Sequence, residues 1–325
     1  MNEPKSVADG VPIWCLLAAS AARRVDAVRM ACVLEATAPK VGNVHPAAHF
    51  HDLNYTHFVS AADATASMLA DLSDVDRVGA VIHSAVTASV VATGTNVNLG
   101  ILLLLGPLLS SEPDWQRDRT HTHSERLTMW QSQTAEQVAR IDPHQGALIA
   151  SAISGAGAGG LTDASLGNDH PLDVNGNHRD SYDILAAMRL AASRDRIAAQ
   201  YAGGFRDLFQ HVVPALQHSV ASSGDLLSGI VLAHINLIAD SGDSLIARKC
   251  GQAESDRVAR LAKECLDTMA RQGERQRVES IRRFDKVLRA DGNRLNPGTT
   301  ADLIAAAIYV LIRTQPHREV TDRVS

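Results

Sequence analysis

Four short polar clusters, each beside a long apolar stretch, hold the residues of this sequence that could do chemistry. They combine carboxylates, cations, amides and glycines, the groups that a magnesium–polyphosphate site requires. Carboxylates bind the metal, lysine and arginine bind phosphate oxygens, and glycines let backbone N–H groups approach a phosphate. In chain order the clusters are Glu35, Lys40, Gly42, His49, His51 and Asp52; Gly94, Thr95, Asn96, Asn98 and Gly100; Asp240, Asp243, Ser244 and Arg248; and Asn296, Pro297, Gly298 and Asp302.

Part of this pattern has a simpler explanation, which is helix capping. Thr95 or Asn96 can cap one helix, Thr299 or Thr300 can cap the last one, and glycine commonly ends helices. Capping does not explain Glu35 and Asp243, which stand where helical faces are otherwise apolar. Acids in such places, with a lysine and an arginine in the same clusters, favour the metal–polyphosphate interpretation.

The elements that must position these clusters are helices. Aromatic residues make up only 4% of the chain while Ala and Leu are abundant, a bias that suits close-packed helices better than sheets. The apolar run that starts at Ile101 is expected to break at Gly106–Pro107. The spacing of apolar residues predicts helices over 12–37, 54–71, 74–93, 182–220, 223–240, 253–290 and 300–314.

We therefore expect an all-α protein, with residues 1–325 forming a single large globular domain whose polar loops line a central cleft. The chain is long enough for a sizeable core. It has no internal repeat of about 20 to 50 residues and no change of composition that would require a second domain. The tails, at about 1–10 and 315–325, are expected to be mobile.

Composition argues against several classes of protein. A net charge of −5 gives no sign of general nucleic-acid binding. The four cysteines include no C-x-x-C pair, which predicts reduced thiols and a cytoplasmic location. No run reaches the roughly 18 apolar residues of a membrane span. The apolar segment 11–22 follows a stretch without a positive excess, so we expect it to be the first buried helix.

Three further motifs are weaker. "GAGAGG" (155–160) has the glycine spacing of a dinucleotide-binding loop but is not followed by a suitable helix. "DVNGNHRD" (173–180) begins like a calcium loop, yet its glycine comes two places early and Ile184 replaces the final glutamate. A magnesium contact from one of its acids stays open. His121 and His123 could bind a metal, but their polar surroundings are typical of an exposed pair.

Taken in chain order, the clusters are similar to the motifs of a known family. Glu35 precedes "PKVG", and "HFHDLNYTHFVSAA" then leads into a helix. "GTNVNLGILLLL", "DSLIARKCG" and "NPGTTADL" follow with similar spacing. From about residue 26 to 314 the chain resembles the ATP:dephospho-CoA triphosphoribosyltransferase family, also called triphosphoribosyl-dephospho-CoA synthases. Its middle, "SYDILAAMRLAASRDRIAAQYAGGF", looks most like the archaeal-type branch.

The resemblance implies an all-helical fold and a transferase reaction. In that reaction a ribose 2′-hydroxyl of 3′-dephospho-CoA attacks the ribosyl C1 of ATP, adenine leaves, and the triphosphate stays on the ribose. The transition state is oxocarbenium-like, so a nearby carboxylate stabilises it. A general base must also take the hydroxyl proton. The resemblance further implies Mg²⁺ as cofactor and ATP as a substrate.

The same resemblance implies roles for individual residues. Glu35, Asp52 and Asp243 would be catalytic or metal-binding acids, with Glu35 and Asp243 holding the metal. His49 or His51 would carry the proton. The nucleotide-binding residues would be Lys40, Gly42, Asn96, Asn98, Gly100 and Arg248.

Some positions differ from the family pattern, and they leave alternatives for function. Val41 stands where the family has a second proline, and Arg248 is followed by Lys249 and Cys250 in place of two glycines. One alternative is a related nucleotide-dependent transferase that makes another cofactor, such as a methanopterin-type one-carbon carrier. Another is a non-catalytic nucleotide-binding or assembly protein. The expected partners are small molecules and a second copy in a homodimer, with neither nucleic acid nor membrane.

Overall fold

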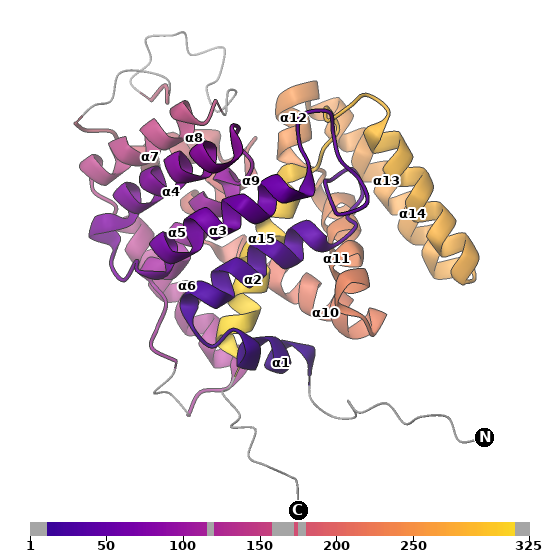
Figure 1. The fold of residues 1–325 in the computed structure, drawn as a ribbon, viewed down its shortest axis with the longest axis horizontal. Helices are drawn as coiled ribbons and strands as arrows, with labels where there is room; N and C mark the ends of the chain where they lie inside the picture. The colour runs from indigo at the N-terminus through magenta and orange to yellow at the C-terminus, as the bar shows by residue number, and fades with distance from the viewer. Residues whose placement is uncertain (1–11, 116–119, 158–171, 175–179, 316–325) are drawn as a thin grey trace, which may run out of the picture.

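The structure, a computed structural model, describes residues 12–115, 120–157, 172–174 and 180–315. Within these residues it holds 15 α-helices and no β-strand, which confirms the prediction of an all-α protein (Figure 1). The first eight α-helices are α1 Ile13–Ser20, α2 Arg24–Thr37, α3 Tyr55–Ala70, α4 Val78–Thr93, α5 Leu99–Ser110, α6 His123–Ala139, α7 Pro143–Gly155 and α8 Ile184–Ala191. The others are α9 Arg196–Gly203, α10 Val213–Ser223, α11 Leu226–Ser241, α12 Ser244–Cys250, α13 Gln252–Arg271, α14 Glu274–Arg289 and α15 Gly298–Thr314.

Helix α15 lies at the centre of the molecule. Every residue from Leu303 to Thr314 is buried, as expected for a helix that is apolar on all sides. It packs against α2, α5, α10 and α11, and Figure 1 shows it in yellow passing behind α2 and α3. Its first turn, at Gly298, is the part that reaches the candidate site.

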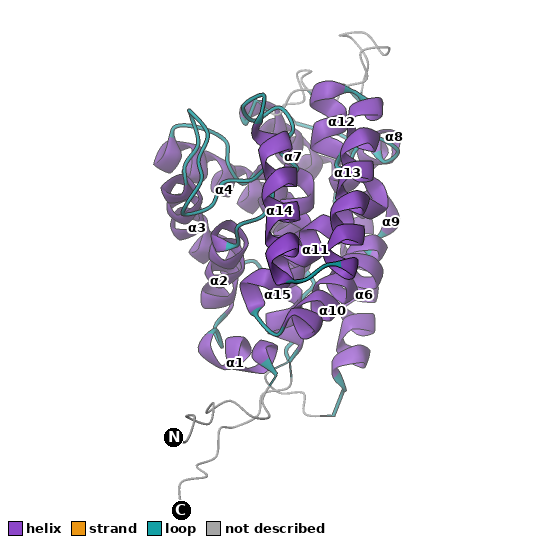
Figure 2. Ribbon diagram, turned by 90° about the vertical axis from the view of Figure 1, so that its right-hand side faces the viewer, coloured by secondary structure: helices purple, strands orange, loops and turns teal. Residues whose placement is uncertain are grey.

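Helices α13 and α14 lie side by side on one flank and cover α11 (Figure 2). The sequence predicts one charged helix over 253–290, and this prediction is wrong in one respect. The chain breaks at Gly273, which is in an extended conformation at the start of α14. The break lets Val258 of α13 and Phe284 of α14 face the same small core, so both helices bury an apolar stripe.

Helix α5 continues through Pro107, although the sequence predicts a break there. Proline removes the N–H that would bond to the carbonyl four residues earlier, which is that of Leu103. The Tyr201 hydroxyl donates a hydrogen bond of 2.7 Å to this carbonyl instead. A buried side chain from α9 therefore replaces the missing backbone bond, and the helix remains intact.

Other sequence expectations can be compared with the structure. The segment 11–22 contains α1, in which Trp14 and Ala18 are buried. The expected mobile tails lie outside the described residues, except for Gln315, which is buried. All four cysteines are free thiols within the described residues.

One helical stretch, Val75–Thr93, is long and apolar enough to cross a membrane, and the bent pair α11–α12 passes the same test if taken as one span. This differs from the expectation that no run is long enough. Length and composition alone are weak evidence, because core helices pass the same test. Helix α4, which makes up most of Val75–Thr93, packs against α3, α5 and α7.

A buried carboxylate joins the ends of α5 and α15 that lie away from the candidate site. The Glu112 side chain is 2% exposed and pairs with the guanidinium of Arg313 at 2.6 Å and with that of Arg24 at 3.1 Å. The Tyr309 hydroxyl donates to the same carboxylate. Three segments distant in sequence, at α2, the end of α5 and α15, are therefore joined at one acid.

We expect Glu112→Ala to lower the free energy of unfolding by about 3–5 kcal/mol, because the buried Arg313 loses its partner. Urea denaturation measures this change. Glu254→Ala is the control, since its carboxylate pairs with Arg257 on the exposed face of α13 and should cost less than about 1 kcal/mol. Equal losses in the two variants would contradict the role of Glu112.

Candidate functional site

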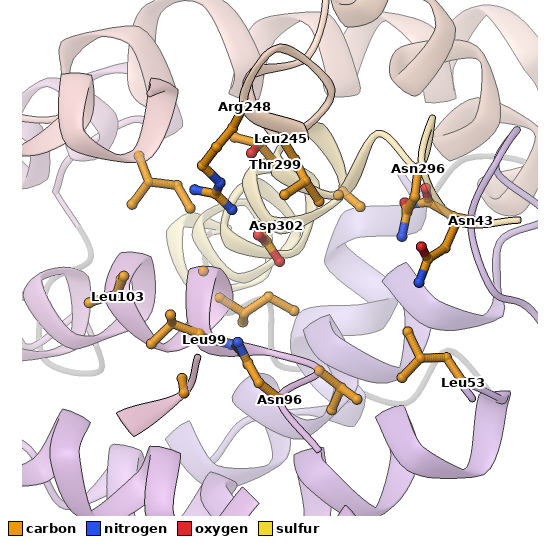
Figure 3. A pocket seen from close by; sticks show the side chains of 18 of the residues that line it. Asn43, Leu53, Asn96, Leu99, Leu103, Leu245, Arg248, Asn296, Thr299 and Asp302 are labelled. Carbon is orange, nitrogen blue, oxygen red and sulfur yellow. Dashed lines mark hydrogen bonds between the residues drawn. The ribbon is translucent and has the colours of Figure 1, made fainter. Parts of the chain in front are cut away.

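A cavity of about 690 Å³ opens among α2, α5, α9, α12 and α15, together with the loops before α3 and α15. Its volume lies in the range of about 300–1,000 Å³ that small-molecule sites occupy. Figure 3 shows side chains from these elements converging on it. The charged residues that line it are the acids Glu35, Asp52, Asp195 and Asp302 and the cations Arg248 and Lys249.

All four sequence clusters contribute to this cavity, although they are far apart along the chain. The clusters meet there because the ends of several helices surround the first turn of α15. The predicted site residues in the lining are Glu35, Asp52, Asn96, Gly100 and Arg248. The predicted site residues outside the lining are Lys40, Gly42, His49, His51, Asn98 and Asp243.

Lys40 lies directly behind Glu35. Its ammonium is fully buried and pairs with the Glu35 carboxylate at 2.8 Å, and it also donates to the Glu35 backbone carbonyl. The nearby His234 is buried in α11, and burial lowers its pKa to about 3, with Lys40 adding to the effect. His234 is therefore uncharged, and Glu35 remains the only acid paired directly with Lys40 among the described residues.

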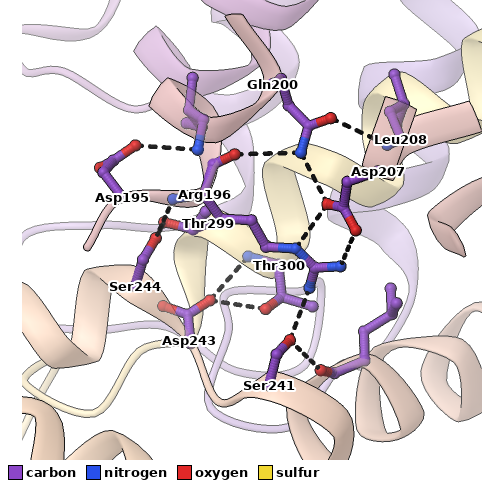
Figure 4. Close-up of polar contacts among 12 residues, drawn as sticks. Asp195, Arg196, Gln200, Asp207, Leu208, Ser241, Asp243, Ser244, Thr299 and Thr300 are labelled. Atoms are coloured by element: carbon purple, nitrogen blue, oxygen red, sulfur yellow. Dashed lines mark hydrogen bonds and ion pairs between the residues drawn. The ribbon is translucent and has the colours of Figure 1, made fainter. Parts of the chain in front are cut away.

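Asp243 joins the starts of α12 and α15 (Figure 4). One carboxylate oxygen accepts the backbone N–H groups of Leu245 and Ile246, the N-cap arrangement of α12. The other oxygen accepts from the N–H and the hydroxyl of Thr300, at 2.8 and 2.7 Å. With both oxygens bonded and the residue 2% exposed, Asp243 acts as a joint between two helices.

The loop between α2 and α3 is fixed to α14. The Gly42 N–H donates to the Asp285 carboxylate at 2.8 Å, and Gly42 has a φ of +71°, which favours glycine. Asp285 also pairs with Arg289, whose guanidinium lies over the Phe50 ring. These contacts bring Asp52 to the mouth of the cavity, where it is exposed.

The remaining predicted residues lie at the edge of the site or below its surface. Asn98 is buried just before α5 and accepts a hydrogen bond from the Ser89 hydroxyl at 2.7 Å. His49 and His51 are exposed on the loop before α3. Asn96 lines the cavity, while its side-chain oxygen accepts the N–H of Leu99.

Two cations line the cavity next to each other on α12. Arg248 pairs with Asp195 at 3.1 Å, and Asp195 is fixed because it caps α9 through the N–H groups of Ile197 and Ala198. The Lys249 ammonium donates to the Asn293 carbonyl at 3.1 Å. Burial lowers the pKa of Lys249, with the Arg248 charge adding to the effect, while acids that include Asp52 oppose it.

Asp302 lies at the centre of the cavity in Figure 3, between Thr299 and Asn96. Burial raises its pKa well above the ordinary value, and Glu35 and Asp243 raise it further. Arg248 opposes these effects, and Asp195 adds to them. No group of three or more His, Cys, Asp or Glu side chains suited to a metal occurs among the described residues.

Two amide residues of the lining have buried oxygens without a hydrogen-bond partner among the described residues. The Oδ1 atoms of Asn43 and Asn296 have no hydrogen-bond partner within the described part of the chain. Both residues line the cavity and lie near each other in Figure 3. Buried polar atoms are almost always hydrogen-bonded, so these two oxygens are suited to bind a donor group of a ligand.

Sequence reasoning missed several lining residues, of which the polar ones include Asn43, Asp195 and Lys249. Asp195 has the sequence signal of a helix N-cap, which gives no sign of its pairing with Arg248. Lys249 follows Arg248, a predicted site residue. Two adjacent cations are common on exposed helices, so the sequence gives no sign that Lys249 lines the cavity. Asn43 follows Gly42, and its neighbours in sequence do not predict its burial.

The weaker motifs contribute little to the described part of the site. Gly157 of "GAGAGG" lines the cavity, while residues 158–160 lie outside the described residues. Positions 175–179 of the calcium-like motif also lie outside them. His123 is the first residue of α6, and its pKa is lowered mainly by burial.

These features define a helical protein with a cavity of the volume of a small-molecule site, lined by four acids and two cations. The sequence profile of ATP:dephospho-CoA triphosphoribosyl transferases matches residues 21–320, which is nearly the whole chain. The chain therefore belongs to this family of triphosphoribosyl-dephospho-CoA synthases, which confirms the predicted family and the prediction of a transferase. No curated protein and no solved structure matches the chain.

Replacing Lys40 tests its place behind the cavity. We expect Lys40→Met to lower the free energy of unfolding by about 3–5 kcal/mol, because the Glu35 carboxylate would stay buried without its cation. Lys249→Met is the matched control and should cost less than about 1 kcal/mol. Urea denaturation measures both. Wild-type stability in Lys40→Met, together with weaker ATP binding, would instead make Lys40 a phosphate ligand.

Proposed function

We propose that this chain transfers the 5-triphosphoribosyl group of ATP to a ribose 2′-hydroxyl of 3′-dephospho-CoA and releases adenine. The observation that carries the proposal is the single cavity in which two adjacent cations face carboxyl groups from separate helices. Family membership supplies the reaction class, and the cavity has the volume of a small-molecule site and two cations that can bind phosphates.

In this proposal, Arg248 and Lys249 bind the triphosphate. Both line the cavity, and Asp195 holds the guanidinium in position. Charge-assisted hydrogen bonds from a guanidinium to phosphate oxygens are strong and directional. Gly100, at the start of α5, lines the same cavity. The triphosphate would anchor ATP so that binding energy is used to place the ribosyl C1.

Asn43 and Asn296 are proposed to bind the adenine. Their buried oxygens need donors, and the exocyclic amino group of adenine is one. Leu53 and Phe58 also line the cavity and offer apolar contact area for a purine. Asn96, on the facing loop, remains a proposed contact to the ribose or base.

Glu35 is proposed to stabilise the oxocarbenium-like transition state. It lines the cavity and is held from behind by Lys40, so its position is fixed before the substrate binds. A preorganised carboxylate beside the reacting carbon is the arrangement that glycosyl transfer uses.

We propose that magnesium binds together with ATP. Asp52 would hold the ion, since its carboxylate is exposed at the cavity mouth and close enough to Lys249 to affect its pKa. When bound, Mg²⁺ neutralises part of the triphosphate charge. Glu35 and Asp243 fit a metal less well, because Lys40 holds the first and four hydrogen bonds occupy the second.

We further propose that residues 1–325 act as a single catalytic domain in the cytoplasm, as a homodimer, without nucleic-acid or membrane partners. The cavity supports the single domain, because it takes residues from α2, α5, α9, α12 and α15 together. The net charge of −5 and the free thiols of the four cysteines are compatible with the cytoplasm.

Adenine release tests the function directly. The protein would be incubated with MgATP, with and without 3′-dephospho-CoA, and free adenine would be measured by chromatography. Release that depends on the acceptor supports the proposal. Release of ADP or phosphate would contradict it, and tight ATP binding without any product would favour a binding or assembly protein. Adenine release with a pterin precursor, but not with dephospho-CoA, would favour synthesis of another cofactor.

Arg248→Met tests the phosphate site. We expect the Kd for MgATP to rise about 10- to 100-fold, because a charge-assisted hydrogen bond contributes about 1.5–3 kcal/mol. Titration calorimetry measures the Kd. Arg257→Met, on α13 away from the cavity, is the control and should bind MgATP like the wild type. An unchanged Kd in Arg248→Met would remove this residue from the phosphate site.

A further inference from the structure

Asp302 stands where an apolar helix meets the cavity. It is the fifth residue of α15, and the residues that follow it are buried in the core. Its carboxyl group points into the open centre of the cavity, towards Asn96 and Leu99 on the opposite wall (Figure 3). A carboxyl group in this place is reachable by a ligand but is otherwise shielded from water.

Gly100 fixes the place of this carboxyl group from the other side. A Cβ atom at Gly100 would lie 2.0 Å from Asp302 Oδ2 and 2.6 Å from its Cγ, far inside contact distance. Only glycine therefore lets the carboxyl group approach the first turn of α5. The close approach explains the glycine in the first turn of α5.

The groups that face Asp302 are mostly acidic. They are Glu35 of α2, Asp195 before α9, Asp243 before α12, and one cation, Arg248 of α12. Helix α5 contributes no ionisable side chain. On α11, His234 is uncharged because burial lowers its pKa to about 3.

Burial and these like charges raise the pKa of Asp302 well above its ordinary value, which favours the protonated form of its carboxyl group. The thiol of Cys32 on α2 shares this environment, and its pKa is raised to about 12 by burial, Glu35 and Asp302. A pKa shifted towards the working pH is what a group that both gives and takes a proton requires.

We propose that Asp302 is the proton carrier of the transfer, acting first on the leaving adenine and then on the acceptor hydroxyl. The inference rests on the proposed function. It assigns the proton-transfer role to a carboxyl group inside the cavity, whereas His49 and His51 are exposed and do not line it.

The step balances within the cavity. As the bond between ribosyl C1 and the adenine nitrogen breaks, its electron pair goes to adenine, and the proton of Asp302 follows it. An electron pair of the acceptor hydroxyl oxygen then forms the new bond to C1, and the hydroxyl proton passes to the Asp302 carboxylate. Asp302 ends protonated, as it began, so the cycle needs no outside proton.

Glu35 and Asp302 then have separate roles that their surroundings set. Glu35 is paired with Lys40, while Asp302 faces other acids. When two carboxyl groups in one site have opposite surroundings, the one among acids acts as the proton donor. The one paired with a cation stays charged and stabilises positive charge. The structure places both on the same cavity without an ion pair between Asp302 and Lys40 among the described residues.

Asp302→Asn tests the proposal through the pH dependence of kcat. Asparagine resembles the protonated carboxyl group, so the Kd for MgATP should stay within about threefold of wild type. The kcat for adenine release should fall about 10²- to 10⁴-fold. In the wild type, kcat should fall as pH rises through the raised pKa of Asp302, because the acid form is lost. Asp302→Asn should lack this alkaline decrease, and Asp302→Glu should keep it.

The controls separate this inference from the proposed function. Acceptor-dependent adenine release by the wild type must be shown first, and its absence would reject the function itself. Asp256→Asn, on the exposed face of α13, should match the wild-type profile. If Asp302→Asn has the kcat and the pH profile of the wild type, the proposed role of Asp302 is wrong, while the proposed function still holds.

Gly100→Ala tests the position of the carboxyl group with its chemistry unchanged. The added methyl group must displace Asp302, so kcat should fall at least about tenfold, a loss equal to 1.4 kcal/mol of transition-state stabilisation. Gly203→Ala is the control, because nothing lies within 4 Å of its added Cβ. Circular dichroism and kcat would be measured for both. Wild-type kcat in folded Gly100→Ala would contradict the positioning.

Discussion

The buried carboxylate of Asp243 is the constraint on which the arrangement of the site depends. It accepts backbone N–H groups from the first turn of α12 and two hydrogen bonds from Thr300 at the start of α15. Arg248 is on α12 and Asp302 is on α15, so one acid sets the distance between a cation and a central carboxyl group. Removing it would leave several buried donors without acceptors, which costs about 1–3 kcal/mol for each.

Around this joint, the chain uses buried acids in three different ways. Glu112 joins the far ends of α5 and α15 through Arg313, and the start of α2 through Arg24. Glu35 is paired with Lys40 and faces the cavity with its position fixed. Asp302 faces acids more than cations, which favours its protonated form. The neighbours of each carboxyl group, more than the residue type, decide what it can do.

The family assignment and the cavity support each other through independent observations. The match over residues 21–320 supplies a reaction in which adenine leaves and a triphosphate is retained. The cavity supplies adjacent cations, unpartnered amide oxygens and two kinds of carboxyl group. A pentosyl transfer needs an anchor for the phosphates, contacts to the base and a path for one proton, and the lining offers a candidate for each.

The sequence by itself determined the helical class, most helix positions and the family, because helical spacing and short motifs are local properties of the chain. It also singled out Glu35, Asp52, Asn96, Gly100 and Arg248, which line the cavity. It could not separate Glu35 from Lys40 and Asp243, since all three look like ligands until burial and hydrogen bonds are known. Only the tertiary structure brought Asp195 to Arg248 and Asp302 to Gly100, and it showed Tyr201 bonding the Leu103 carbonyl that Pro107 leaves free. Such pairings join residues from distant helices. The role of a charged group, or of a carbonyl without its helical hydrogen bond, depends on the partner that folding brings next to it.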